Sequence, residues 1–341
     1  MSKKRAFITG ANGYIGSYLT KYLAEKDIET IAYILKGTDC DFLKMIYPSL
    51  KNVKIIEGNV LDNSSLQNEI KGSNYVIHLA GVIKGYTQEE CDKINVKGTK
   101  NLLDACVKVN PGVDRVVLIS SSAAGGYGTP EDPLTEDKEL KPFPKDFYGV
   151  SKYKMEIVSK AYKKSLPISI VRPCAVAGPG NNVTLDYYSL TKMGVKMVFN
   201  GPRKEVSLVD IDDLIYGIYL CAIKQEAIGE AFYFSCDGSV TINEMQEIIN
   251  YKIFGRKYGS LLSLPVSRFL MKTVAIILEV ICKLQKKPIH FINLSKVNGA
   301  FAPGHVVSSD KAKRLLGWKP EQTIVSLIDR EGKWFKDQGL I

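Results

Sequence analysis

The N-terminal sequence combines an apolar strand, a glycine-rich turn and an amphipathic helix. Residues 5–9 form a short apolar run, and Gly10, Gly13 and Gly16 follow at three-residue intervals. Apolar residues then recur at helical spacing, namely Ile15, Leu19 and Leu23. The first glycine permits a tight turn, the second lets the backbone approach a pyrophosphate, and the third lets the helix pack on the strand. Because the start of a helix offers free N–H groups to phosphates, this unit predicts a dinucleotide site.

Apolar runs continue to alternate with helical stretches through the first half of the chain. The expected strands are Thr30–Leu35, Val53–Ile56, Tyr75–Leu79, Val116–Ser120 and Ile168–Val171. This rhythm predicts an α/β fold with a Rossmann-type, doubly wound parallel sheet. We expect residues 1–175 to form the dinucleotide-binding domain and residues 176–341 a smaller, mainly substrate-binding region. The two parts are expected to interleave, with a segment near residues 205–235 returning to the sheet.

The composition is that of an ordinary globular protein of 341 residues, with a net charge of +10. The lysines are spread along the chain without a dense basic tract, so nucleic acid is not expected as a partner. The seven cysteines are scattered and never form a Cys-x-x-Cys pair, which argues against a disulfide framework or a zinc site. No basic segment followed by an apolar one opens the sequence. A reducing, cytoplasmic location is therefore expected.

Tyr148 and Lys152 are four residues apart, a spacing that puts both side chains on one face of a helix. A lysine ammonium near a phenol stabilises the phenolate, so Lys152 is expected to lower the pKa of Tyr148. A tyrosine prepared in this way can act as a general acid or base. The alternative is an exposed helix face without chemistry, which the glycine-rich turn makes the weaker interpretation.

The Gly-x-x-Gly-x-x-Gly turn together with Tyr-x-x-x-Lys resembles the extended branch of the short-chain dehydrogenase/reductase superfamily. That branch also holds sugar-nucleotide epimerases, dehydratases and 3β-hydroxysteroid dehydrogenases. The resemblance continues through collinear motifs: Val76–Gly81, Asn95–Thr99, Ile119–Ser122, Val171–Pro173, Val209–Leu214 and Leu315–Pro320. It implies a nicotinamide cofactor, a small-molecule substrate and a Ser-Tyr-Lys catalytic group. Asn95 matches a family asparagine whose role is structural.

The end of the second strand bears on the choice between NAD(H) and NADP(H). NAD sites usually carry an acidic residue there, which binds the ribose 2′-hydroxyl. In this chain no acid appears until Asp39, whereas Lys36 lies about where a 2′-phosphate would bind. We therefore expect NADP(H) to be favoured over NAD(H). The full set of expected cofactor contacts is Gly10, Asn12, Gly13, Tyr14, Ile15, Lys36, Asn59, Val60, Leu79, Ala80, Gly81, Tyr148, Lys152 and Pro173.

Three serines follow the fifth strand, at the edge where ligands bind in open α/β sheets. Counted from the strand, Ser122 matches the catalytic Ser/Thr of the family, and Ser121 is the competing choice. Counting back from Tyr127-Gly128 would instead reach Ala123, because the intervening loop is one residue longer than the common form. The resemblance then implies that Tyr148 moves the proton, Ser122 donates a hydrogen bond to the substrate oxygen, and Lys152 supports Tyr148 and contacts the nicotinamide ribose.

The sequence predicts an NAD(P)-dependent oxidoreductase that interconverts a ketone and a secondary alcohol on an apolar substrate, such as a steroid or a long-chain β-keto compound. A sugar-nucleotide 4-epimerase with tightly bound NAD is the alternative, with Asn181 and Asn182 as candidate diphosphate contacts. A third alternative is a non-enzymatic dinucleotide-sensing scaffold, against which the intact Ser122, Tyr148 and Lys152 argue. The sequence leaves open the substrate identity, the direction of the reaction and the oligomeric state, for which a homodimer is considered.

The segment 261–282 is strongly apolar but contains Arg268, Lys272 and Glu279, which argue against a membrane-spanning helix. Pro265 can start a helix with a broad apolar face that includes Phe269 and Ile277. Three interpretations remain open for this helix. It could be a core helix, a lid whose apolar face completes the substrate pocket, or a helix that makes peripheral contact with a membrane surface.

Overall fold

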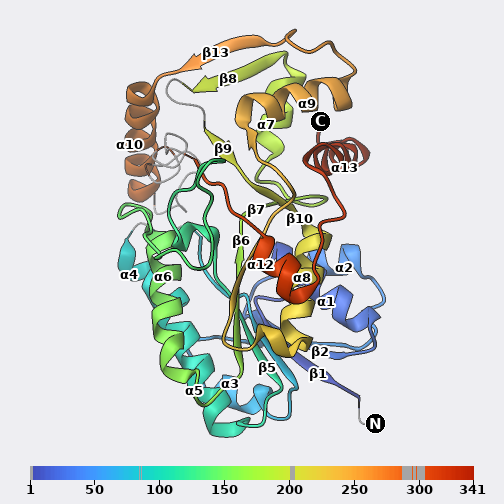
Figure 1. Cartoon of the computed structure of the whole chain (residues 1–341), viewed down its shortest axis with the longest axis vertical. Coiled ribbons are helices and arrows are strands. Elements are labelled where there is room, and N and C mark those ends of the chain that lie inside the picture. Colours follow the sequence, from blue (N-terminus) through green and yellow to red (C-terminus); the bar gives the residue numbers. More distant parts are fainter. Residues whose placement is uncertain are drawn as a thin grey trace.

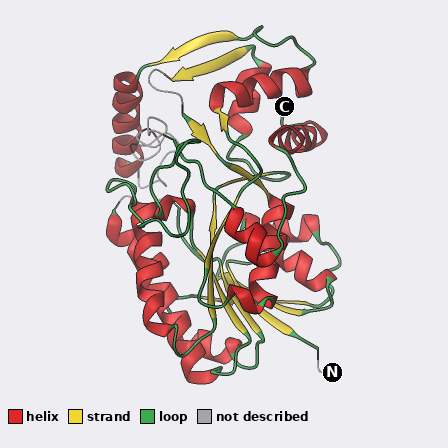
Figure 2. Cartoon of the chain, in the orientation of Figure 1, coloured by secondary structure: helices red, strands yellow, loops and turns green. Residues whose placement is uncertain are grey.

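The computed structural model describes residues 3–83, 85, 87–199, 204–285, 294, 297 and 304–341. Seven parallel strands form the central sheet in the order β11-β6-β5-β4-β1-β2-β3. Their bounds are β1 Arg5–Thr9, β2 Glu29–Leu35, β3 Val53–Gly58, β4 Tyr75–His78, β5 Arg115–Ile119, β6 Ile168–Pro173 and β11 Ala231–Phe234. The predicted α/β fold with a doubly wound parallel sheet is thus confirmed (Figure 2).

Helices cover both faces of the sheet (Figure 1). One face carries α1 (Tyr14–Glu25), α8 (Ile211–Ile223) and α12 (Asp310–Leu316), and α2 (Asp41–Ile46) packs beside α1. The other face carries α3 (Asn63–Ile70), α5 (Thr99–Val109) and α6 (Phe147–Ser159). The short helix α4 (Gln88–Asp92) and a π-helical turn, η1 (Lys93–Gly98), lead into α5.

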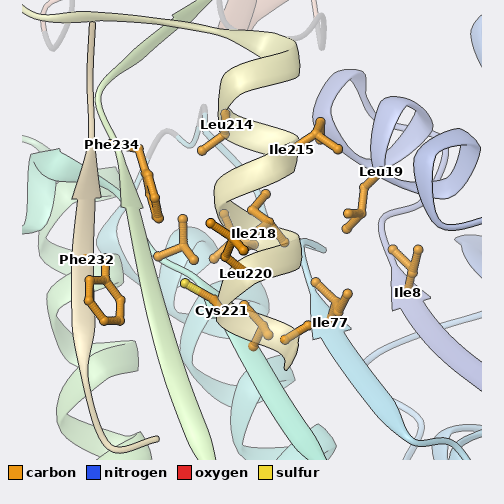
Figure 3. Packing of buried hydrophobic residues seen from close by; sticks show 14 of the residues in the cluster. Ile8, Leu19, Ile77, Leu214, Ile215, Ile218, Leu220, Cys221, Phe232 and Phe234 are labelled. Atoms are coloured by element: carbon orange, nitrogen blue, oxygen red, sulfur yellow. The ribbon is translucent and has the colours of Figure 1, made fainter. Parts of the chain in front are cut away.

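The core on the α8 face joins segments that are far apart in the sequence. Figure 3 shows Leu214 and Ile218 of α8 between Phe234 of β11 and Ile77 of β4. Trp318, which follows α12, is also fully buried in this cluster and donates its indole N–H to the carbonyl of Asp213. Residues from beyond position 210 therefore complete the core of the N-terminal sheet.

The remaining elements form a smaller region beyond the carboxyl ends of the strands (Figure 1). It contains the helices α7 (Leu185–Lys192), α9 (Ile242–Phe254), α10 (Arg268–Leu284) and α13 (Ile324–Asp337). Short strand pairs complete it: β7 (Ala175–Ala177) with β10 (Leu208–Asp210), β9 (Glu205–Val206) with β12 (Val240–Thr241), and β8 (Val195–Phe199) with β13 (Leu262–Val266). The division into residues 1–175 and 176–341 remains a proposal. β6 ends close to that boundary, and β11 pairs with β6 in the main sheet.

None of the helices in the described part of the chain is long and apolar enough to cross a bilayer.

Candidate active site

The glycine-rich turn folds as a cradle between β1 and α1. Gly10 has a φ of +68°, and a Cβ there would stand 2.8 Å from the backbone nitrogen of Ala80. A Cβ on Gly16 would stand 2.1 Å from the carbonyl oxygen of Gly10. Only glycine fits either position, because the first needs the left-handed region and the second needs close helix–strand packing.

The N-terminus of α1 is left open to an anion. Its N-cap is Gly13, which has no side chain to accept from the first-turn N–H groups, and the first turn contains no acidic residue. The helix dipole and the N–H groups therefore face the site without an internal competitor. The Tyr14 side chain packs among Tyr18 and Phe42, so its contribution at the turn is that of its backbone. These residues fit the diphosphate of a dinucleotide.

The other expected cofactor residues surround this turn along the edge of the sheet. The Asn12 amide donates to the Thr38 hydroxyl at 2.9 Å and to the Asp39 carbonyl at 2.8 Å, which ties the turn to the loop after β2. Lys36 is exposed in that loop. Asn59 is exposed after β3, where its amide oxygen accepts from the Leu61 N–H at 2.9 Å, and Val60 beside it is buried. This bond already occupies one of the two lone pairs through which the Asn59 amide oxygen could accept from a cofactor.

The loop after β4 brings Gly81 close to the Lys152 ammonium. A Cβ on Gly81 would stand 2.9 Å from Asn95 Oδ1 and 3.4 Å from Lys152 Nζ. The side-chain amide of the buried Asn95 accepts from the Val82 N–H and donates to the Val82 carbonyl. It also donates to the Ser151 hydroxyl at 2.8 Å. Asn95 thus joins η1, the loop after β4 and α6, which agrees with the structural role that the resemblance implied. Leu79 and Ala80 are partly buried and Pro173 is buried at the end of β6.

Tyr148 and Lys152 lie one turn apart on α6, but their electrostatics differ from the expectation. Burial raises the pKa of Tyr148 to about 12, and a hydrogen bond with Ser121 acts in the opposite direction. The Lys152 ammonium lies 5.9 Å from the centre of the Tyr148 ring and donates to the Ile119 carbonyl at 2.7 Å. Burial also lowers the pKa of Lys152 to about 8, although the nearby Glu156 raises it. In the chain alone, desolvation therefore outweighs the expected lowering of the Tyr148 pKa.

The two candidate serines have different surroundings. Ser122 is buried, and its hydroxyl lies 2.5 Å from Nε2 of His305. Ser121 is partly exposed, accepts from the Ala123 N–H at 3.2 Å and is the hydroxyl that pairs with Tyr148. The structure thus places the competing serine, rather than Ser122, beside the tyrosine.

His305 arrives from the far end of the sequence and was not among the expected site residues. Burial lowers its pKa to about 4, and a hydrogen bond with the Gly126 backbone raises it slightly. The ring is therefore neutral, with its N–H directed to that carbonyl and Nε2 accepting from the Ser122 hydroxyl. The rarity of histidine could have identified it from the sequence, because the chain has only three histidines and this one lies in the apolar run Gly304–Val307.

Beneath the site, Arg172 and Glu156 form a buried ion pair. The guanidinium donates to Glu156 through Nε at 3.0 Å and through a terminal nitrogen at 2.7 Å, and the Ser120 hydroxyl donates to the same carboxylate at 2.6 Å. This pair joins β6 to α6, so Arg172 supports the packing of the helix on the sheet. Glu156 follows Lys152 by four residues, and that helical spacing could have revealed it.

A parallel sheet with this glycine turn and a Tyr-x-x-x-Lys helix defines a nicotinamide-dependent oxidoreductase of the extended short-chain type. The chain belongs to the NAD dependent epimerase/dehydratase family, whose model matches residues 6–232. The predicted superfamily and the predicted enzyme class are thereby confirmed.

Relatives and solved structures differ in the substrates that their names state. A UDP-glucose 4-epimerase of Vibrio cholerae is 28% identical over 286 residues, covering 75% of this chain and 83% of that protein. A decarboxylating sterol-4-alpha-carboxylate 3-dehydrogenase of Mus musculus is 23% identical over 344 residues, covering 96% and 90%. The fold also matches a UDP-glucuronic acid 4-epimerase from Bacillus cereus, solved with UDP-glucuronic acid and NAD, with a TM-score of 0.75 at 21% identity, covering 98% and 99%.

Proposed function

We propose that this chain interconverts a ketone and a secondary alcohol by hydride transfer, with a Ser-Tyr-Lys group at the end of β5 and the start of α6. The observation that carries the proposal is the cluster of Ser121, Tyr148 and Lys152, whose lysine lies against Gly81 in the loop that also packs on the glycine turn. When bound, the nicotinamide cofactor supplies or accepts the hydride. Tyr148, protonated at neutral pH, donates a proton to the substrate oxygen in the direction of reduction.

The proposed roles of the two serines follow from their hydrogen-bond partners. A hydroxyl has one proton to donate, and that of Ser122 is given to His305. The hydroxyl beside Tyr148 belongs to Ser121, which is proposed in place of Ser122 as the donor to the substrate oxygen. While Tyr148 is protonated, its phenol can donate to the Ser121 oxygen and leave the Ser121 proton for the substrate. The Lys152 ammonium has three N–H donors and gives one of them to the Ile119 carbonyl. The others are proposed to donate to the nicotinamide ribose.

An apolar substrate is the proposed class. Ile83 follows Gly81 by two residues with 62% of its surface exposed, and Tyr127, 40% exposed, packs on Phe143 in the loop after η2 (Ser122–Ala124). Asn181, a candidate diphosphate contact, is buried, with its amide donating to the Val176 carbonyl and accepting from the Val183 N–H. The Asn181 amide, which a sugar nucleotide would need at this position, is thus already hydrogen-bonded to the backbone of the chain.

We further propose NADP(H) as the preferred cofactor, because the loop after β2 offers Lys36 and no nearer acid than Asp39. A cytoplasmic location is proposed because all seven cysteines are free and buried, as expected in a reducing compartment. Residues 261–282 are proposed to meet the membrane surface in which an apolar substrate dissolves.

A sugar-nucleotide 4-epimerase is the second candidate, favoured by the Vibrio cholerae relative. The two are separated by incubating the purified protein with NADPH or NADH and a panel of β-keto esters, 3-ketosteroids and UDP-hexoses. Consumption of reduced cofactor with a ketone, lost in Tyr148→Phe, supports the proposal. Interconversion of UDP-hexoses without net change in cofactor would replace it with the epimerase.

A further inference from the structure

Helix α10 turns its apolar side outward. Seen along the helix, the residues that face the body are Met271, Val274, Ala275, Leu278 and Cys282, which are partly or fully buried. The opposite side carries Phe269, Ile276, Ile277, Val280, Ile281 and Leu284, with exposed fractions between 42% and 81%. Phe269 and Ile277, which a core helix would bury, are 81% and 51% exposed. The core interpretation of this side is therefore wrong for the described structure, and the lid interpretation stays a prediction.

The strand that precedes α10 also carries exposed apolar side chains. β13 leads into α10, and its Leu262 and Leu264 are 70% and 52% exposed. Figure 1 shows α10 at the margin of the molecule, between the β8–β13 pair and the helices α4 and α6. Large contiguous apolar patches on a protein surface mark contact sites, and single exposed apolar residues do not.

Cations border this surface along one side. At 3.6 residues per turn, Arg268, Lys272 and Lys283 fall on the flank of α10 next to the outward face. Glu279 shares this flank but accepts from the Leu294 N–H at 2.7 Å. A helix with a wide apolar face and a basic border is typical of helices that lie in a lipid interface. A second copy of the chain fits less well, because antiparallel two-fold pairing of this face would bring the cationic flanks of the two helices together.

The N-terminal turn of α10 lies near the loop that leads from η2 to α6. Arg268 is near enough to act electrostatically on Tyr127, in the loop after η2, and on Lys204. The same loop continues toward Asp146, the residue before α6, which acts on the catalytic Tyr148. A surface that rests on α10 would therefore lie near the loop that connects η2 to α6.

We propose that α10 and β13 form a docking face for an anionic phospholipid surface, with the apolar side chains in the acyl boundary and the basic border against the headgroups. This places the entrance of the site at the membrane, from which an apolar substrate can enter. The inference rests on the proposed function only for that substrate. The lipid contact itself is measurable without any substrate.

The experiment is co-sedimentation of the full chain with vesicles of phosphatidylcholine alone or with about one third phosphatidylglycerol. We expect binding to the anionic vesicles, and Ile277→Ser/Val280→Ser should weaken it about tenfold or more. The matched control is Ile157→Ser/Val107→Ser, which replaces an exposed isoleucine on α6 and an exposed valine on α5. This variant should bind vesicles like the wild type. Circular dichroism of each variant reports whether it is folded.

The charge variant Lys272→Gln/Lys283→Gln should weaken binding to anionic vesicles about 25-fold, at about fivefold for each cation. Lys160→Gln/Lys164→Gln removes the same charge elsewhere and is the control. Wild-type protein that stays in the supernatant would overturn the proposal, as would binding that ignores the α10 variants. A dimer in sedimentation velocity that dissociates in Ile277→Ser/Val280→Ser, without vesicle binding, would assign the face to a second copy.

Discussion

At the scale of single residues, Ser121 and Ser122 are neighbours in the sequence but differ in what their hydroxyls contact. We expect Ser121→Ala to lower kcat about 100-fold or more, because a donor to the substrate oxygen is lost. Ser122→Ala should keep kcat within a few-fold but lower the free energy of unfolding by about 1–3 kcal/mol, since His305 Nε2 loses its buried donor. Steady-state kinetics and urea unfolding check both effects.

Ser121→Thr is the matched control, because it retains the hydroxyl and should retain much of kcat. The reverse result, with a large loss of kcat in Ser122→Ala and a mild one in Ser121→Ala, would restore the assignment made from the strand spacing.

The pKa of Lys152 predicts a pH dependence. With a pKa of about 8, Lys152 loses its charge as the pH rises through 8, whereas Tyr148 stays protonated until about 12. Since kcat/KM reports the free enzyme, kcat/KM for ketone reduction should fall above pH about 8. Lys152→Arg, which stays charged, should lack this descending limb. A wild-type profile that is flat to pH about 10 would contradict the assignment to Lys152.

Lys36 provides a test of cofactor preference. Lys36→Ala should weaken NADP(H) binding about tenfold or more and leave NAD(H) binding nearly unchanged, because a charge-assisted contact to a phosphate is worth roughly 1.5–3 kcal/mol. Fluorescence titration with both reduced cofactors gives the two Kd values. Exposed Lys44→Ala on α2 is the control. If the variant weakens both cofactors equally, Lys36 does not meet the 2′-phosphate.

At the scale of elements, β6 and α6 are joined by the buried Arg172–Glu156 pair. Glu156→Gln should lower the free energy of unfolding by about 3–5 kcal/mol, because it leaves the arginine charge buried without its counter-ion. Glu29→Gln removes the same group from the exposed pair with Arg5 and should cost less than about 1 kcal/mol. If urea unfolding gives the same loss of unfolding free energy for both variants, burial does not increase the cost of breaking the ion pair.

Local patterns predicted most elements and part of the site. The strands and the glycine turn follow from apolar runs and glycine spacing, which are short-range properties. The pairing of Ser122 with His305 could not be predicted, because His305 reaches it through backbone pairing of residues 304–307 with the loop after η2 and with β9. The exposure of the apolar side of α10 was also not predicted. An apolar pattern shows which side of a helix is apolar, but it does not show whether protein, substrate or solvent contacts that side.

At the scale of the whole molecule, the proposed apolar substrate and the lipid face make a joint prediction. For water-soluble β-keto esters, kcat/KM should rise with chain length by about 0.8 kcal/mol for each buried methylene. Ile277→Ser/Val280→Ser should leave this rise unchanged in solution, because these side chains point away from the body. Kinetics along the series check this. A rise that flattens in the variant would mean that α10 closes over the substrate as a lid.

The shared core on the α8 face also bears on how the protein is made. β11, α8 and Trp318 complete a hydrophobic cluster whose first members belong to β1 and α1. During translation, at about 5–20 residues per second, the N-terminal strands leave the ribosome well before the residues that cover them. For that interval the nascent sheet presents bare apolar surface on one side and an open edge at β6. Synthesis of this protein should therefore depend on chaperones that shield nascent chains more than its compact final form suggests.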